Sequence, residues 1–237
     1  MIFVFSSIEL KGDKTQGMRI RTLFIIIAFL LATGWFFFPA MKPEGDRLWF
    51  AMRLALPAAL LALGGIGLIP TLMTFAFVFC ALGDAMGVLG SFEGQMAGFA
   101  LAHICFISYF MKDIRASRPL PIVFIATTLL CLVPLVLAAT KVIPQIKDLP
   151  IKIGCCIYAL LLTGTVWTSI VRAFSIKNGR KALPYVTAMG AILFLISDFV
   201  LSWNRFTVHI PHASLYIMTT YYAALLLLFV VTLKTKS

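Results

Sequence analysis

The stretch LPIVFIATTLLCLVPLVLAA, residues 120–139, decides the fold class because it carries no charged side chain. A helix needs about 20 predominantly apolar residues to cross the hydrocarbon core of a bilayer, and this stretch meets that requirement. Similar runs lie on both sides of it. Together the runs cover residues 21–39, 47–64, 67–91, 94–111, 120–139, 150–173, 182–203 and 213–233. They predict an all-α, polytopic membrane helix bundle with eight transmembrane helices.

The composition supports an integral, multi-pass membrane protein. Of the 237 residues, 61% are hydrophobic and only 12% are charged, whereas a soluble domain is about half apolar and a quarter charged. The net charge of +11 does not form a basic, soluble face. The cations lie between the apolar runs, where they set topology and contact anionic lipid headgroups. The bilayer is therefore the expected partner, and nucleic acid is excluded.

The distribution of Lys and Arg predicts the orientation. With the N-terminus in the cytoplasm, thirteen of the 20 Lys and Arg residues lie on the cytoplasmic side and seven on the opposite side. An excess of these residues marks cytoplasmic loops, so both termini are predicted to be cytoplasmic. Residues 1–18 are mixed and unperiodic, which predicts a flexible cytoplasmic tail. Residues 19–237 are expected to form a single transmembrane domain.

Two carboxylates lie inside the apolar runs. Asp84 is found in FCALGDAMGVLG (residues 79–90) and Asp198 in LFLISDFVLSWNRF (residues 193–206). From the helical rise, they lie ~10 Å and ~8 Å below the outer ends of their spans. A charge within a span costs at least ~2.5–3.5 kcal/mol, so such residues usually face a cavity and function there.

Other polar residues are expected at the same depth: His103, Tyr158, Tyr221, Tyr222 and Arg53. The sequence therefore predicts one polar chamber in the outer half of the membrane.

Each member also has a structural explanation. Asp84 can pair with Arg53, and Asp198 can form an interfacial salt bridge near Asn204 and Arg205. His103 can serve as an interhelical hydrogen-bonding group. Tyr221 and Tyr222 can belong to an aromatic belt, and Ser197 can simply pack between helices.

At these residues the chain resembles the lysoplasmalogenase family of YhhN-like integral membrane proteins. The motifs that carry the resemblance are Gly83-Asp84, the FxxSDxxL block at 194–201 with Asn204-Arg205-Phe206, the segment from Gly98 to His103, and Tyr221-Tyr222-Ala223. The similarity spans roughly residues 20–233, and the family implies eight helices.

The resemblance implies a metal-independent ether hydrolase that needs no cofactor. Its substrate would be a lysophospholipid, lysoplasmenylethanolamine or lysoplasmenylcholine, and its products a fatty aldehyde and glycerophosphoethanolamine or glycerophosphocholine. Asp84 and Asp198 would be the catalytic pair. The residues expected to bind the substrate are His103, Tyr158, Ser197, Asn204, Arg205, Tyr221, Tyr222 and Arg53.

The chemistry suits paired acids. A vinyl ether opens when its β-carbon is protonated, which gives an oxocarbenium ion that water attacks. A carboxyl group kept protonated by desolvation and by a like-charged neighbour is a suitable donor. The second carboxylate stabilises the cation and takes a proton from water, as in glycoside hydrolysis. The sequence leaves open which aspartate is the donor.

Three other functions compete with this one. A proton-coupled transporter would use the buried Asp and His residues as a relay, but no internal repeat accompanies the eight spans. A metal-dependent lipid amidase would use His103, His209 and His212, although the last two are expected in a loop. A non-catalytic scaffold would not need two acids at one depth.

Overall fold

The computed structural model describes residues 2–38, 46–117, 120–175 and 182–233 of the chain. Within these ranges the secondary structure is helical and no strand occurs. The helices are α1 (Ile2–Phe37), α2 (Arg47–Gly65), α3 (Thr71–Val88), α4 (Phe92–Ser117), α5 (Pro121–Leu137), α6 (Leu149–Ser175), α7 (Ala182–Phe206) and α8 (Ala213–Thr232). Each forms a stretch long and apolar enough to cross a membrane, which for α5 continues beyond the helix to Gln145, and this confirms the predicted eight-helix bundle.

Local sequence sets where helices begin and end. The Asp46 carboxylate accepts a hydrogen bond from the backbone N–H of Trp49 at 3.1 Å and so caps the start of α2. After α2 the chain turns at Gly67, whose φ of +79° favours glycine. Pro70 then directly precedes α3. The span predicted from residue 67 therefore begins at Thr71.

The end of α5 departs from regular helix geometry. Pro134 lies inside α5 and removes one backbone donor from its ladder. The chain then passes into a π-helical turn, η2 (Ala138–Val142), and a short 3₁₀ segment, η3 (Ile143–Gln145). π-Helical turns occur frequently beside functional sites, and η2 borders the cavity described below.

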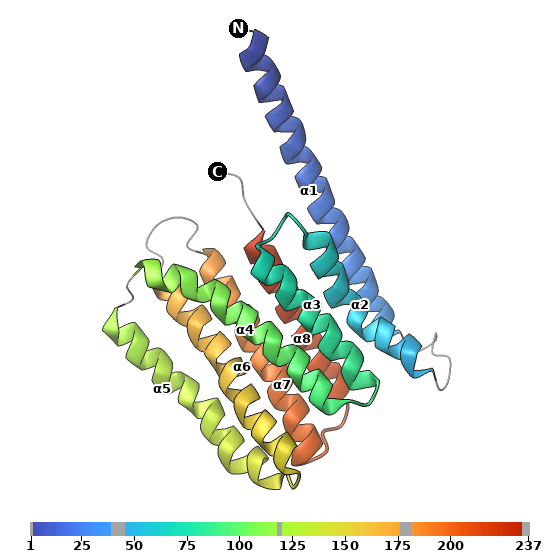
Figure 1. The fold of residues 1–237 in the computed structure, drawn as a ribbon, viewed down its shortest axis with the longest axis vertical. Helices are drawn as coiled ribbons and strands as arrows, with labels where there is room; N and C mark the ends of the chain where they lie inside the picture. Colours follow the sequence, from blue (N-terminus) through green and yellow to red (C-terminus); the bar gives the residue numbers. More distant parts are fainter. Residues whose placement is uncertain (1, 39–45, 118–119, 176–181, 234–237) are drawn as a thin grey trace.

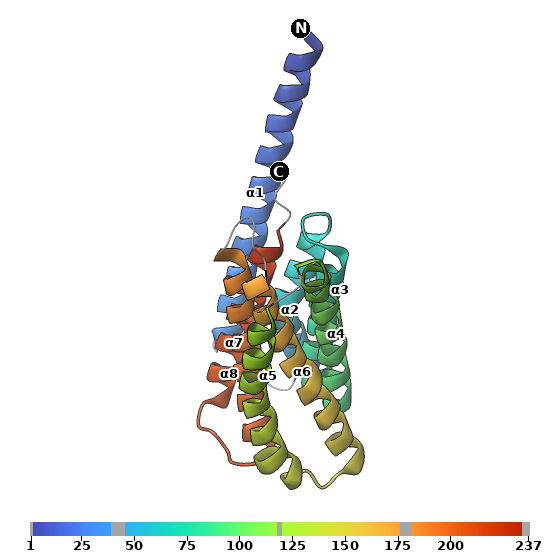
Figure 2. The same ribbon diagram turned by 90° about the vertical axis from the view of Figure 1, so that its left-hand side faces the viewer.

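Helix α1 is longer than its apolar run. The sequence predicted a flexible tail over residues 1–18, whereas the helix begins at Ile2 and continues without a break to Phe37. No proline interrupts it. Its N-terminal part extends well beyond the bundle, past the last turn of α8 (Figures 1 and 2). The cytoplasmic location of this end stays a prediction.

Six helices form a closed ring, and two pack outside it. Around the ring, α2 contacts α3, α3 contacts α4, α4 contacts α6, α6 contacts α7, α7 contacts α8, and α8 returns to α2 and α3. Helix α1 packs on α2 at one flank, and α5 packs on α6 at the opposite flank (Figure 1). The outer surface is rich in exposed Leu, Ile and Phe side chains, above all on α5. Such a surface suits a surrounding bilayer rather than water.

Two arginines tie α1 and α2 together at opposite ends. Arg21 on α1 donates to the carbonyl oxygens of Gly64 and Ile66 at the end of α2, each at 2.9 Å. Arg53 on α2 donates to carbonyl oxygens at the end of α1, including Phe36 at 3.0 Å. The last carbonyls of a helix lack intrahelical partners and carry partial negative charge. Each arginine therefore caps the C-terminus of the helix opposite.

Candidate functional site

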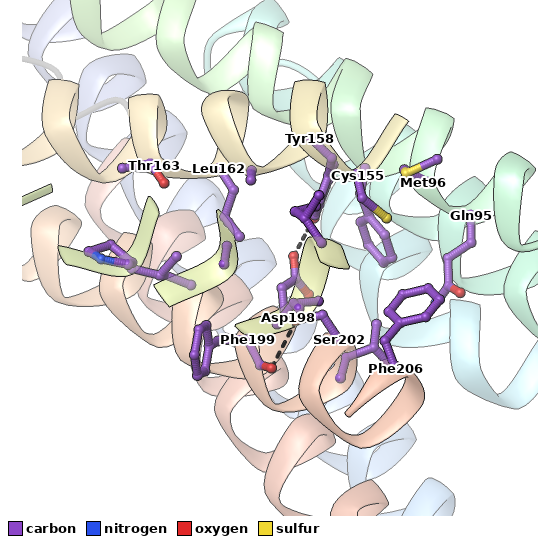
Figure 3. Close-up of a pocket in the computed structure, with 18 of the residues that line it drawn as sticks. Gln95, Met96, Cys155, Tyr158, Leu162, Thr163, Asp198, Phe199, Ser202 and Phe206 are labelled. Atoms are coloured by element: carbon purple, nitrogen blue, oxygen red, sulfur yellow. Dashed lines mark hydrogen bonds between the residues drawn. The ribbon is translucent and has the colours of Figure 1, made fainter. Parts of the chain in front are cut away.

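A hydrogen-bonded chain joins α7, α6 and α4. The hydroxyl of Tyr158 on α6 is hydrogen-bonded to Oδ2 of Asp198 on α7 (Figure 3). The same hydroxyl lies 3.3 Å from Nε2 of His103 on α4, and Nδ1 of His103 lies 3.0 Å from Oγ1 of Thr165, again on α6. His103 has no exposed surface and Asp198 is 7% exposed. Four polar side chains from three helices thus form one continuous group.

The second aspartate belongs to a neighbouring group. Asp84 on α3 is 3% exposed and accepts a hydrogen bond from the hydroxyl of Tyr221 on α8 at 2.8 Å. The two aspartates therefore have separate tyrosine partners, Tyr221 for Asp84 and Tyr158 for Asp198.

Two glycines allow the backbones of α3 and α4, which carry Asp84 and His103, to pack in close contact. A Cβ atom on Gly98 of α4 would lie 2.8 Å from the Cα and N atoms of Gly83 on α3. Real side chains do not approach backbone atoms so closely, so a substitution here would push the helices apart. Asp84 follows Gly83 directly, and His103 lies five residues after Gly98. The Gly-Asp motif thus has a packing role as well as a polar one.

Asp198 lines a cavity of about 770 Å³, a volume that includes its open mouth. Most of the wall is apolar, and its polar side chains include those of Gln95, Tyr158 and Ser202 (Figure 3). The wall is formed by α4, α6 and α7 together with Pro134 and residues from η2 and η3. Asp198 is the one carboxylate that contributes to the lining among the described residues. The cavity therefore combines an apolar space with a single acid.

Several residues predicted to share the chamber lie outside this lining. Asp84 and His103 are placed behind the wall, as their burial and hydrogen bonds show. The hydroxyl of Ser197 donates to the Ile217 carbonyl at 3.0 Å, which joins α7 to α8. Tyr222 donates to the backbone carbonyl of Leu54 on α2 at 3.1 Å. These two hydroxyls hold helices together.

Asn204 and Arg205 lie near the end of α7. Oδ1 of Asn204 accepts from the backbone N–H of Ile210 at 2.7 Å and so orders the turn after the helix. The guanidinium of Arg205 lies 4.0 Å from the ring centroid of Phe92. Phe92 lines the cavity, so the exposed positive charge of Arg205 is separated from the cavity by the Phe92 ring.

Arg53 forms no salt bridge with Asp84 or Asp198 in the part of the chain that the structure describes. It has no exposed surface, and its guanidinium lies 5.2 Å and 4.7 Å from the ring centroids of Trp35 and Trp49. Its Nε and Nη1 atoms have no hydrogen-bond partner. Together with the bonds to the end of α1, this environment gives Arg53 a structural explanation.

The structural alternatives for the aspartates can be compared with the ion pairs present. Neither Asp84 nor Asp198 forms a salt bridge within the described ranges, where the ion pair found is Arg172–Asp113 at 2.6 Å. In the same ranges, no three His, Cys, Asp or Glu side chains gather as a metal site would require. Metal independence remains a prediction from the resemblance.

Some contributing residues were not predicted. They are Thr165, Cys80 and Ser202, whose hydroxyls and thiol are of a kind common in apolar helices. Helical spacing carries a signal for two of them: Thr165 lies seven residues after Tyr158, and Ser202 lies four after Asp198. Residues at these spacings share one face of a helix.

The comparisons with known proteins agree with the resemblance. The profile of the YhhN family matches residues 47–232. The human lysoplasmalogenase TMEM86B is 31% identical over 201 residues, which cover 81% of this chain and 80% of that protein. The mouse lysoplasmalogenase TMEM86B is 29% identical over 237 residues, covering 93% and 96%, and the bovine lysoplasmalogenase TMEM86A is 26% identical over 155 residues, covering 64% and 60%. No solved structure matches the chain.

Proposed function

We propose, because the chain belongs to the YhhN family, that it is an integral membrane hydrolase that cleaves the vinyl ether bond of lysoplasmalogens. The name lysoplasmalogenase, carried by the relatives, points to this reaction. The products are a fatty aldehyde and a glycerophosphoethanolamine or glycerophosphocholine. The observation that carries the proposal for this chain is a single carboxylate, Asp198, in the wall of an otherwise apolar cavity.

The cavity suits a single-chain lipid. Its apolar wall accommodates a hydrocarbon chain. The vinyl ether bond of a lipid bound there can contact the Asp198 carboxyl group. Arg205, exposed beside Phe92, is suited to contact the phosphate of the headgroup. In this arrangement Tyr158 and Arg205 contact the substrate. Ser197, Tyr222 and Arg53 act by holding the helices in place.

The reaction begins with protonation of carbon. Asp198 in its acid form gives its proton to the β-carbon of the vinyl ether, where the π electrons form the new C–H bond. The α-carbon and the ether oxygen then share the positive charge of an oxocarbenium ion. The Asp198 carboxylate left behind stabilises that cation electrostatically.

Water completes the reaction. Its oxygen bonds to the α-carbon, and one of its protons returns to the Asp198 carboxylate. The resulting hemiacetal loses its glycerol oxygen as an alcohol and becomes the fatty aldehyde. One water is consumed, and the acid form of Asp198 is restored.

Asp84 takes the supporting role in the proposed pair. It does not line the cavity, and its bond to Tyr221 holds its carboxylate at a fixed position in the bundle. Its charge acts on the site through space, where the low dielectric of the bundle strengthens such effects. We therefore assign proton transfer to Asp198 and an electrostatic contribution to Asp84.

The direct test uses purified protein with three lipids that differ at one bond. Aldehyde release is expected from lysoplasmenylethanolamine. The alkyl ether has no double bond to protonate and should be inert, and the acyl ester should also be uncleaved. A parallel sample with a chelator should retain full activity. Efficient ester cleavage, or no aldehyde from the vinyl ether, would contradict the proposal.

A further inference from the structure

The chain of hydrogen bonds from Asp198 to Thr165 restricts where hydrogens can lie. Thr165 has one hydroxyl hydrogen, and it is donated to the backbone carbonyl of Leu161 at 3.1 Å. Thr168 on the same helix donates to Gly164 in the same way, at 2.8 Å, as hydroxyls in helices commonly do. Oγ1 of Thr165 is then left as an acceptor. Its contact with His103 therefore requires a hydrogen on Nδ1.

The next contact involves the single hydrogen of Tyr158. If Tyr158 donates to the Asp198 carboxylate, its contact with His103 requires a hydrogen on Nε2 as well, so His103 is doubly protonated. If Tyr158 donates to Nε2 instead, its oxygen must accept a hydrogen from the acid form of Asp198. Both arrangements hold one proton more than an ionised Asp198 beside a neutral His103.

The two arrangements differ in charge. One places a cation and an anion inside the bundle, and the other leaves every member uncharged. His103 has no exposed surface, and isolated charges are costly to bury there. The uncharged arrangement is therefore the resting form, with the additional proton on Asp198.

We propose that Thr165, His103 and Tyr158 are positioning residues that keep the catalytic proton on Asp198. This inference rests on the proposed hydrolysis and identifies how its acid is held ready. When Asp198 protonates the β-carbon, Tyr158 turns its hydrogen from His103 to the new carboxylate. When water returns a proton to Asp198, the resting arrangement is restored.

Other titratable groups surround Asp198, and the test must leave them in place. They are Cys80 and Asp84 on α3, His103 on α4, Cys155 and Tyr158 on α6, and Tyr221 on α8, with Arg205 acting on Cys155. Thr165 has no titratable side chain, so its substitution changes the hydrogen-bond count alone.

Thr165→Val is the informative variant. Without the Thr165 oxygen, Nδ1 of His103 no longer needs a hydrogen, and the hydrogen can lie on Nε2 and point to Tyr158. Tyr158 then donates to an ionised Asp198, and the chain is satisfied with one proton fewer. Thr168→Val is the matched control because it removes the same hydroxyl one turn away. Thr165→Ser restores the hydroxyl and should rescue the wild-type behaviour.

The measurement is infrared difference spectroscopy of the full-length protein at pH 7. The carbonyl band of a protonated carboxyl group is assigned to Asp198 by its loss in Asp198→Asn. The wild type, Thr168→Val and Thr165→Ser should show this band. Thr165→Val should lose at least half of it, and its aldehyde release should fall at least tenfold. A melting curve for each variant confirms that it is folded.

Two results would overturn the inference. One is a wild type without the Asp198 band, since Thr165 would then donate to His103 and no additional proton would be held. The other is a Thr165→Val protein that matches Thr168→Val in both band and rate. If the bands behave as expected but no protein releases aldehyde, the proton assignment stands and the proposed hydrolysis fails.

Discussion

Replacing Asp198 with Asn removes the acid while keeping its shape. The Asn side chain can still form a hydrogen bond with the Tyr158 hydroxyl, which contacts Oδ2 of Asp198 in the wild type. It cannot give a proton to carbon, and it leaves no carboxylate beside the oxocarbenium ion. The substitution therefore separates chemistry from packing at the single acid of the cavity wall.

The expected loss follows from the role assigned to Asp198. General acid catalysis contributes about 10²–10⁴-fold, which corresponds to about 2.7–5.4 kcal/mol of the activation barrier. The stability should change by no more than about 1 kcal/mol, because one hydrogen bond is retained and no salt bridge of Asp198 is present in the described ranges.

The assay measures aldehyde release from lysoplasmenylethanolamine per folded molecule, with folding followed by thermal melting. Asp113→Asn is the matched control: it makes the same change in the Arg172–Asp113 ion pair, and its turnover should stay near normal. Asp84→Asn should lose less activity than Asp198→Asn, since Asp84 lies behind the wall. The reasoning is refuted if folded Asp198→Asn keeps more than a tenth of the normal turnover.

Three further predictions concern the cavity, the helix caps and the orientation. Ala159→Trp fills the cavity that Ala159 lines and should cut aldehyde release at least tenfold. The control Ile157→Trp, at an exposed position outside the lining, should leave aldehyde release unchanged. Equal effects of the two substitutions would show that the cavity is not the site of the reaction. Arg53→Gln should lower the Tm by about 4–8 °C, because it loses about 2 kcal/mol of charge-assisted hydrogen bonding, and should leave the KM unaltered. A raised KM at a normal Tm would show instead that Arg53 binds the substrate. In a cysteine-free background, a cysteine at position 209 should react with an impermeant reagent from outside, and one at 177 only after permeabilisation; the opposite pattern would reverse the predicted topology.

The sequence predicts the spans and the common level of Asp198 and Tyr158 well, because both depend on position along a helix. Apolar length determines where a helix can cross the bilayer. The rise per residue places Asp198 and Tyr158 at one level, and the structure joins them by a hydrogen bond.

Rotation about the helix axis is what the sequence leaves undetermined. In the sequence, Asp84 lies in an apolar run much like that around Asp198. In the structure its side chain bonds to Tyr221 and does not line the cavity. A residue's direction depends on how neighbouring helices pack, and here that packing includes the contact of Gly83 with Gly98. The contacts of Arg53 could not be predicted for another reason: its partners are backbone carbonyls, which every residue carries and no sequence pattern marks.

The two arginine caps have a consequence for how the protein enters the membrane. Arg53 is satisfied by α1, and Arg21 by α2, so neither helix alone provides the acceptors that its own arginine needs. A single helix released into lipid would carry an unsatisfied guanidinium, at a cost of at least ~2.5 kcal/mol if it lies near the bilayer centre. We therefore expect α1 and α2 to leave the insertion machinery as a pair, and the first stable unit of biogenesis to be this hairpin.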